Sequence, residues 1–387
     1  MSSAWQLPEH IADVLPDEAR RIETLRRVLQ DAAASYGYEP VIPPLVEHIE
    51  SLLSGTGHAL DLRTFKLVDQ LSGRTLGIRA DTTPQVARID AHLLNRDGVV
   101  RLCYCGVVLH TLPASLHASR EPLQFGAEIF GHAGLEADLE AQDLALDCLR
   151  LAGVGPLVLD LADTRILRGL LAGLPWEAAR IEAVQDALVA KDVPELTALT
   201  RQADAQVRGG LLALTGLYGD EDVLRAAREQ LPARALVRTA LDDLDWLARH
   251  LRSAHPEVRI GFDLADLSGY SYYSGARFAV YGRSGDALAR GGRYDDVGAV
   301  FGRARPAAGF TVQDLKGIAT HMPDENRRAG IRSLWSDDPA WRGAVRRLRE
   351  QGERVHCLLP GHDGPPHAAD CDRELVAANG QWTVRPL

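Results

Sequence analysis

The spacing of apolar positions along the first part of the chain alternates between the helical and the strand period. Residues 17–36 carry apolar side chains at three- and four-residue intervals and end before Gly37, which predicts an amphipathic helix. Residues 65–81 predict a hairpin that turns at Ser72 and Gly73. Further predicted elements follow in order: a helix over 84–95, strands over 101–110 and 123–131, and a helix over 137–152.

From about residue 153 the pattern becomes mainly helical. After one strand over 156–163, a stretch rich in Ala, Leu, Arg and Glu predicts a mainly helical insert from about 165 to 256. A final helix is expected to begin near Val312. Strands return before it, over 258–266, 272–282 and 286–296. Strands interrupted by a helical block, with helices at either end, predict an α+β fold in which an antiparallel sheet is flanked by helices.

The last part of the chain is expected to form a small separate domain. The segment 322–330 (MPDENRRAG) has the composition of a linker, which divides a core domain, 1–324, from a short α/β C-terminal domain, 325–387. The predicted elements of this domain are a strand over 330–336, a helix over 339–351, a strand over 354–361, and a strand pair around Asn379 and Gly380.

Composition narrows the class of protein. The 387 residues suggest two or three domains, and 46% hydrophobic with 25% charged residues is ordinary for a globular protein. The net charge of −10 means that nucleic-acid binding would need a local basic patch. Arg342, Arg346 and Arg349 share one face of a predicted helix, and we favour a solvated face there over an RNA contact.

The cysteines and the apolar segments indicate a cytoplasmic protein. The five cysteines form no CxxC pair, which favours a reducing compartment over a disulfide framework or a zinc site. The N-terminus lacks the apolar region of a signal peptide, and no apolar stretch reaches the length of a membrane span. We expect no metal and no cofactor.

Three separated segments place polar groups where apolar strand residues would be expected. Gln124 and Glu128 alternate with apolar neighbours, so they share one face of a strand. Asp81 follows another strand, and tyrosines cluster before a third, in SGYSYYSG (268–275). A carboxylate on a half-buried sheet is costly unless it meets a cation or several donors. The set suits a small zwitterion with a ring nitrogen that donates, and a solvent-facing sheet surface is the alternative.

The glycine-rich segment 291–296 (GGRYDD) has two interpretations. Its glycines could let the backbone approach a ligand, but the pattern of a phosphate-binding loop is absent. A hairpin turn is the favoured interpretation.

These segments, in this order, resemble the catalytic core of histidyl-tRNA synthetase, a class II synthetase. The resemblance covers roughly residues 8–320 and implies a class II antiparallel sheet flanked by helices. The matching segments are GYEPVIPPLVE (motif 1), the hairpin FKLVDQLSGRTLGIRADTTP, RLCYCGVVLH through LQFGAEIFG (motif 2), the histidine-specific SGYSYYSG and ARGGRYDD, and RPAAGFTVQDL (motif 3).

The resemblance implies that the histidine pocket is kept and the nucleotide apparatus is lost. The pocket residues implied are Asp81, in place of the family's glutamate, with Thr83, Gln124, Glu128, Tyr272 and Tyr273. The positions at which the family carries its nucleotide-binding and activating residues are changed here. In and around motif 2 they are His110, Leu112, Pro113 and Ala118, and Arg120 is the one arginine of this loop that is kept. Ser268 and Lys316, the latter in motif 3, stand in place of two further arginines. Arginine–phosphate contacts are charge-assisted and bidentate, and His or Lys does not reproduce them. We therefore expect no catalytic residues of a synthetase.

A synthetase-like chain without activation residues, and with only a short C-terminal domain, resembles the ATP phosphoribosyltransferase regulatory subunit family. That resemblance implies a non-catalytic regulatory subunit that partners a short-form catalytic subunit at the first step of histidine biosynthesis. It further implies L-histidine as the feedback effector, a homodimer as the building block of a hetero-oligomer, and no tRNA or membrane partner.

The sequence leaves several alternatives open. The chain could be a divergent histidyl-tRNA synthetase, or a synthetase-like binding protein that acts on another target. Inhibitory histidine could bind the synthetase-like pocket or a subunit interface. The helical insert and the outer face of the sheet are both candidates for contact with the catalytic subunit.

Overall fold

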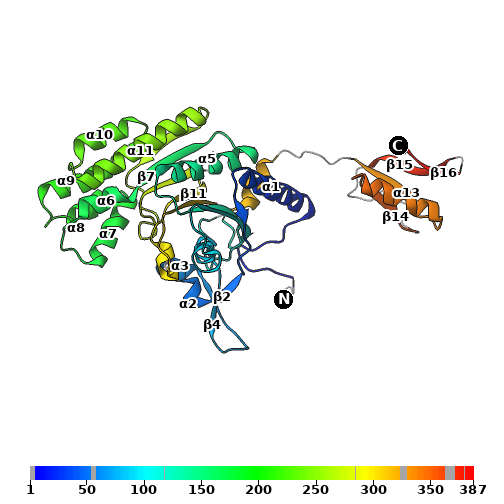
Figure 1. Ribbon diagram of the computed structural model, residues 1–387, viewed down its shortest axis with the longest axis horizontal. Helices are drawn as coiled ribbons and strands as arrows, with labels where there is room; N and C mark the ends of the chain where they lie inside the picture. Colours follow the sequence, from blue (N-terminus) through cyan, green and yellow to red (C-terminus); the bar gives the residue numbers. More distant parts are fainter. Residues whose placement is uncertain are drawn as a thin grey trace. The chain divides into compact units, whose positions relative to one another are not determined.

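The computed structural model describes residues 5–53, 58–116, 118–283, 285–322, 329–361, 371–378 and 380–387. The chain divides into two compact units, Met1–Met322 and Pro323–Leu387 (Figure 1). The boundary expected between residues 324 and 325 lies outside the described residues. None of the helices in the described part of the chain is both long enough and apolar enough to span a membrane.

The first unit is built on a nine-stranded sheet. Most neighbouring strands are antiparallel, and the pairs β1/β5 and β7/β9 are parallel. In spatial order the strands are β1 (Glu39–Pro40), β5 (Val100–Val107), β6 (Leu123–Phe130), β12 (Ala307–Val312), β11 (Ala287–Arg293), β10 (Ala276–Tyr281), β7 (Val158–Asp163), β9 (Arg259–Asp263) and β8 (Tyr218–Gly219). The α+β fold class expected from the sequence is confirmed.

One face of this sheet is covered by long helices. Helices α1 (Pro16–Ser35) and α5 (Leu135–Leu151) pack over β6, β11 and β12. Leu25 and Leu29 of α1 join Phe125 and Ile129 of β6 in one core, because odd positions of β6 point toward these helices. The even positions of β6 are left for the opposite face.

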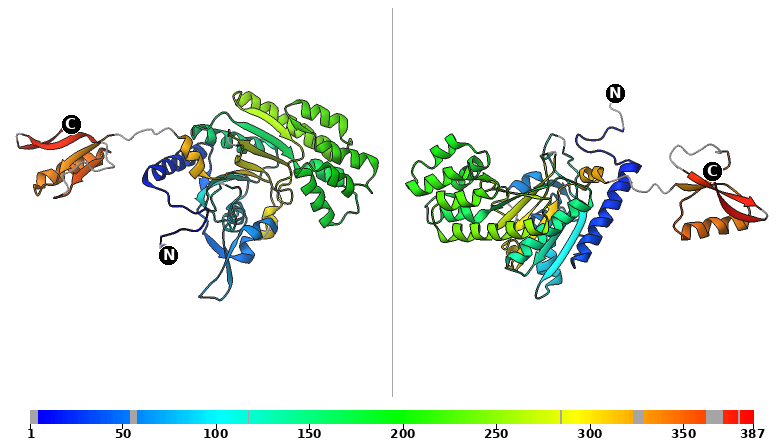
Figure 2. Two further views of the ribbon diagram at one scale, coloured as in Figure 1. Left: turned by 180° about the vertical axis from the view of Figure 1, so that it is seen from behind. Right: turned by 90° about the horizontal axis from the view of Figure 1, so that it is seen from above.

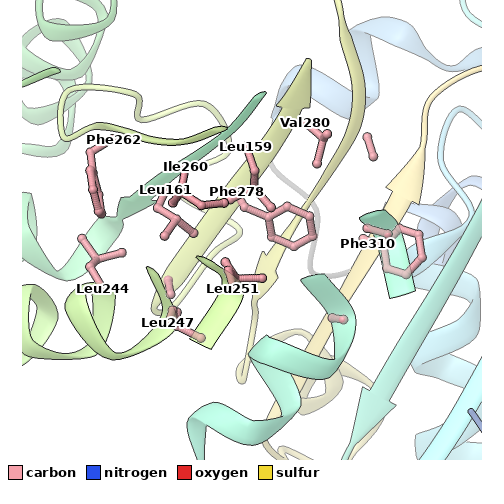
Figure 3. Close-up of a cluster of buried hydrophobic side chains, with 14 of the residues drawn as sticks. Leu159, Leu161, Leu244, Leu247, Leu251, Ile260, Phe262, Phe278, Val280 and Phe310 are labelled. Carbon is pink, nitrogen blue, oxygen red and sulfur yellow. The ribbon is translucent and has the colours of Figure 1, made fainter. Parts of the chain in front are cut away.

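Further along the sheet, α11 (Ala235–Ala254) covers the same face. Figure 3 shows Leu244, Leu247 and Leu251 beside the buried side chains of β7, β9 and β10. Their spacing of three and four residues is the helical period that predicted this part of the insert. The insert also contains α6 (Thr164–Leu171), α7 (Ala178–Val189), α8 (Val193–Leu199), α9 (Ala205–Leu214) and α10 (Asp222–Gln230), coloured green at one end of the sheet in Figures 1 and 2.

The first unit also contains a small three-stranded sheet and several short helices. The predicted hairpin is present as β3 (Phe65–Val68) and β4 (Thr75–Ile78), with β2 (Val46–His48) on the far edge of β4. Gly73 has a φ of 71°, which a turn in this position requires. The short helices are α2 (Ile49–Leu52), α3 (His58–Arg63), α4 (Thr83–Arg88) continuing as a π-helical turn over Ile89–Leu94, and a 3₁₀ turn over Val297–Phe301.

Two predictions about this unit are wrong. Val312 does not begin a helix but ends strand β12, and α12 (Leu315–Ile318) begins after Asp314, whose side chain accepts a hydrogen bond from the Lys316 amide. All six residues of β12 are buried, so the alternation that marks a half-buried strand is absent from its sequence. Residues 291 and 292 form no turn either, because they lie within β11.

The second unit has its own sheet and core. Its strands, in the order β14 (Val355–Leu358), β13 (Gly330–Leu334), β15 (Cys371–Ala378) and β16 (Gln381–Pro386), support one helix, α13 (Pro339–Glu350). Ile331, Trp341, Val345 and Leu375 are buried together. The Trp341 indole donates a hydrogen bond to the Ser333 hydroxyl at 2.8 Å, which satisfies its one polar group.

Candidate functional site

The polar side chains at even positions of β6, Gln124 and Glu128, lie on the face of the sheet opposite α1 and α5. Gln124 and Glu128 are 6% and 1% exposed, so the interpretation of this face as a solvated sheet surface is wrong. The loop and helix that follow β4 cover it, since Thr83 at the start of α4 donates a hydrogen bond to Glu128 at 3.0 Å. Thr82 donates a long one, 3.5 Å, to the Gln124 amide oxygen.

A cavity of about 300 Å³ opens on this surface. Five of the six residues expected in a histidine pocket line it: Asp81, Thr83, Gln124, Tyr272 and Tyr273. Glu128, the sixth, lies directly behind Thr83. Three stretches that are distant in the sequence are thus brought to one place by the pairing of β6 with its neighbours and by the segment before β10.

Glu128 occupies a dry site lined with hydroxyl groups. Its carboxylate accepts hydrogen bonds from Thr83, from Tyr104 on β5 at 3.3 Å, and from the Tyr294 hydroxyl. Burial raises the pKa of Glu128 to about 8, and the nearby charge of Asp81 adds to the rise, while the hydroxyl donors oppose it. A side chain at Gly309 would overlap the carboxylate, so β12 needs glycine beside it.

Asp81 is the second acid of the site. Its carboxylate accepts a hydrogen bond from the Thr83 amide at 3.3 Å, at the beginning of α4. Burial raises the pKa of Asp81, and the backbone donors of Thr83 and Thr82 and the charge of Arg63 act in the opposite direction. Two acids with raised pKa values beside one cavity form a site that a cationic ligand would stabilise.

Aromatic rings close the side of the cavity formed by the segment before β10. Tyr272 lies edge-on to Tyr273, with 5.3 Å between ring centroids, and stacks on Tyr294 at 5.1 Å. The Tyr272 hydroxyl is buried without a hydrogen-bond partner among the described residues. A buried hydroxyl of this kind is costly unless a ligand satisfies it.

Sequence reasoning missed Tyr104 and Tyr294, the two tyrosines that donate to Glu128. Tyr294 belongs to the GGRYDD segment, which we interpreted as a turn. Tyr104 stands opposite Gly126 in the β5–β6 pairing and also contacts the Thr311 hydroxyl at 2.8 Å. The signal for both was strand register: each lies on the same face as Glu128 once the strands are aligned.

Three arginines of the cavity were also missed. Arg277 on β10 and Arg290 on β11 line it together with Arg63 from α3. Arg277 is 2% exposed and forms an ion pair with Asp266 at 2.6 Å. The cavity therefore has acidic groups near β6 and the start of α4, two guanidinium groups on its β10–β11 side, and the exposed guanidinium of Arg63 on α3.

The positions expected to have lost nucleotide binding are neutral or engaged elsewhere. Burial lowers the pKa of His110 to about 4, so its imidazole is neutral, and its Nε2 lies 2.9 Å from the Ala80 carbonyl oxygen. The Lys316 ammonium pairs with Glu121 at 3.3 Å. The Ser268 hydroxyl donates to Asp266 at 2.7 Å, and the Arg120 Nε donates to the His110 carbonyl at 3.1 Å.

The described residues contain no group of three or more His, Cys, Asp or Glu side chains placed to hold a metal ion. The cavity itself is lined by charged groups, hydroxyl groups and aromatic rings.

The raised pKa of Glu128 predicts an unusual dependence of stability on pH. The ordinary carboxyl pKa of 4.5 applies to the unfolded chain, and about 8 applies to the folded protein. Between these values the folded state binds more protons, so the free energy of unfolding contributed by this group falls as the pH rises. We expect Glu128→Gln to stabilise the ligand-free protein by roughly 3 kcal/mol more at pH 8 than at pH 5.

Urea unfolding of both proteins at the two pH values measures this difference. Glu229→Gln, an exposed substitution on α10, serves as the matched control and should show no such change. Equal effects of Glu128→Gln at pH 5 and pH 8 would show that Glu128 titrates normally.

Comparison with known proteins gives consistent matches over both units. The family model described as Histidyl-tRNA synthetase matches residues 10–317, and the one described as ATP phosphoribosyltransferase subunit HisZ C-terminal domain matches residues 328–385. The ATP phosphoribosyltransferase regulatory subunit of Variovorax paradoxus is 61% identical over 387 residues, which cover 100% of both chains.

Solved structures show the same fold. An ATP phosphoribosyltransferase regulatory subunit/histidyl-tRNA synthetase from Bacillus halodurans aligns with a TM-score of 0.81 and 25% identity, covering 95% of this chain and 96% of that one. A chain of the ATP phosphoribosyl transferase (HisG:HisZ) complex from Thermotoga maritima aligns with a TM-score of 0.59 and 19% identity, covering 78% and 98%. The class II synthetase-like architecture expected from the sequence is confirmed.

Proposed function

Because the chain belongs to the family of ATP phosphoribosyltransferase regulatory subunits, we propose that it senses histidine for a short-form catalytic subunit of that enzyme. Histidine binds in the cavity beside Asp81, Thr83, Gln124, Glu128, Tyr272 and Tyr273 and inhibits the first step of histidine biosynthesis. The catalytic subunit supplies the sites for ATP and phosphoribosyl pyrophosphate. The complex is a cytoplasmic hetero-oligomer built on a homodimer of this chain, without tRNA.

The observation that carries the proposal is the pair of buried acids beside a cavity with an unpartnered tyrosine hydroxyl. Asp81 and Glu128 both have raised pKa values because they are buried, and the Tyr272 hydroxyl lacks a partner among the described residues. Histidine brings an ammonium group and imidazole N–H donors, which satisfy acids and hydroxyls of this kind. Its ring can pack against the tyrosine rings that line the cavity.

The nucleotide side of the site supports a regulatory rather than an activating role. A neutral His110 cannot provide the charged, bidentate contact that a phosphate group receives from arginine. Lys316 and Ser268 already have acidic partners. Histidine would therefore be bound without being activated.

Feedback then follows from differential binding. If histidine binds one quaternary state of the complex more tightly than another, it shifts the population by that difference, typically about 1–3 kcal/mol in regulated proteins. A state in which the catalytic subunit is inactive needs only this advantage to predominate at high histidine concentration.

The test is an assay of phosphoribosyltransferase activity with a short-form catalytic subunit, with and without this chain, titrated with histidine. We expect the catalytic subunit to need this chain for full activity and the activity of the complex to fall as histidine is added. An Asp81→Asn complex should remain active but respond only at higher histidine concentrations. Activity that is independent of this chain would refute the proposal, and a stimulated but histidine-insensitive complex would refute its feedback part.

A further inference from the structure

We propose that Arg290, supported by Arg277, recognises the carboxylate of the bound amino acid, so that the cavity selects a zwitterion by both of its charges. The inference rests on the function proposed above and adds the part of the site that accepts negative charge. Three observations support it: the register of the sheet, the unsatisfied hydrogen-bond donors of Arg277 and Arg290, and the charge balance of these two arginines.

Strand register places Arg290 on the same face as the acids. Gly126 on β6 pairs with Thr311 on β12, and Thr311 pairs with Arg290 on β11. Residues paired across a sheet point to the same side, and neighbouring strands lie about 4.8 Å apart. Arg290 is therefore two strands, or about 10 Å, from the polar positions of β6. A side chain from each end can reach a small molecule lying between them.

Arg290 has donors that the protein leaves unused. Its Nη1 is buried, and within the described parts of the chain this atom has no hydrogen-bond partner and Arg290 forms no ion pair. Arg290 is only partly buried, but a guanidinium donor held away from water without a partner is costly. An anionic group in the adjoining cavity would remove this cost.

Arg277 occupies the neighbouring strand with its charge already balanced. In the next row of the sheet, Arg277 pairs with Gly292 of β11. Its Nη1 donates to the Asp266 carbonyl at 2.7 Å and forms the ion pair with the Asp266 carboxylate, while its buried Nε lacks a partner among the described residues. Arg277 thus offers a hydrogen-bond donor at a fixed position, and Arg290 offers an unbalanced positive charge.

This charge balance favours a carboxylate over a nucleotide phosphate. On the β10–β11 side of the cavity, one unbalanced guanidinium, assisted by a neutralised one, matches a single negative charge. Arg63, the third arginine, is exposed to solvent on α3, where its Nη2 lies 3.2 Å from Nδ1 of His110. A di- or triphosphate would bring several charges into a cavity of about 300 Å³ that also contains Asp81, with Glu128 behind it. An amino acid instead places its ammonium near the acids and its carboxylate near Arg290.

Calorimetric titration of the full chain with L-histidine and with histamine tests the inference. Histamine has the same ring and amine and lacks the carboxylate. We expect wild-type protein to bind histidine more tightly than histamine by about 10- to 100-fold, the range for loss of a charged hydrogen-bonded contact. Arg290→Gln should lose this preference by weakening histidine binding alone, and Arg290→Lys should restore part of it. Arg283→Gln, an exposed substitution between β10 and β11, should change neither affinity.

The outcomes separate the two proposals. A wild-type protein that binds no histidine would overturn the proposed function, and this inference with it. Histidine binding with the same histidine-to-histamine ratio in wild type and Arg290→Gln would overturn only the role of Arg290. Binding of adenosine monophosphate that disappears in Arg290→Gln, with that ratio unchanged, would show that the guanidinium serves a phosphate and that the carboxylate assignment is wrong.

Discussion

Replacing Glu128 by glutamine is expected to weaken histidine binding by about 100-fold. Glutamine keeps the size of the side chain and can still meet the hydroxyls of Thr83 and Tyr104, but it cannot carry the negative charge that stabilises a cationic ligand. A lost charged contact contributes about 1.5–3 kcal/mol, and the upper end applies in this buried site when the carboxyl is ionised, above its raised pKa of about 8. Isothermal titration of histidine into both proteins measures the effect.

The variant also separates binding from folding. Because we expect Glu128→Gln to raise the stability of the ligand-free protein, weaker binding could not be attributed to unfolding. Glu229→Gln on the exposed face of α10 should bind histidine as the wild type does. Unchanged affinity in Glu128→Gln would remove this residue from the histidine site.

The chain is expected to catalyse histidine-dependent exchange of pyrophosphate into ATP at least about 10⁴-fold more slowly than a histidyl-tRNA synthetase. Loss of one donor that stabilises a transition state costs about 10²–10³ in rate, and several such positions are changed. His110 is neutral, and Lys316 is paired with Glu121. The measurement is exchange of labelled pyrophosphate in the presence of ATP and histidine.

A single restored cation should not recover this activity. His110→Arg returns one guanidinium and leaves Ser268 and Lys316 unchanged, so exchange should stay at the background level. Exchange by the wild-type chain at a rate typical of synthetases would identify it as a divergent synthetase and refute the regulatory assignment.

Local sequence pattern was sufficient where alternation marks one buried and one polar face. The polar positions of β6, Gln124 and Glu128, were identified this way, and the structure places both on one buried face. The same rule failed for β12, which is buried on both faces and has no alternation to detect. It also failed for residues 291 and 292, where glycines suggested a turn but lie in β11. A side chain at Gly291 would overlap the Gly309 carbonyl, so close strand contact explains that glycine.

The parts of the site that the sequence did not reveal depend on the alignment of distant strands. Tyr104, Arg277, Arg290 and Tyr294 are unremarkable within their own segments. They become site residues only because pairing from β5 to β10 sets them on one face. Strand order and register are tertiary properties, and no single segment encodes them.

The division of the site between strands and loops has a consequence for how substitutions act. The groups proposed to face the amino acid include strand residues, Glu128 on β6 and Arg290 on β11, whereas Leu112 and Pro113 lie in the connection between β5 and β6. Connections accept substitutions that a packed sheet does not. Changes in this connection can therefore remove contacts to a nucleotide while leaving the acidic positions of the sheet intact.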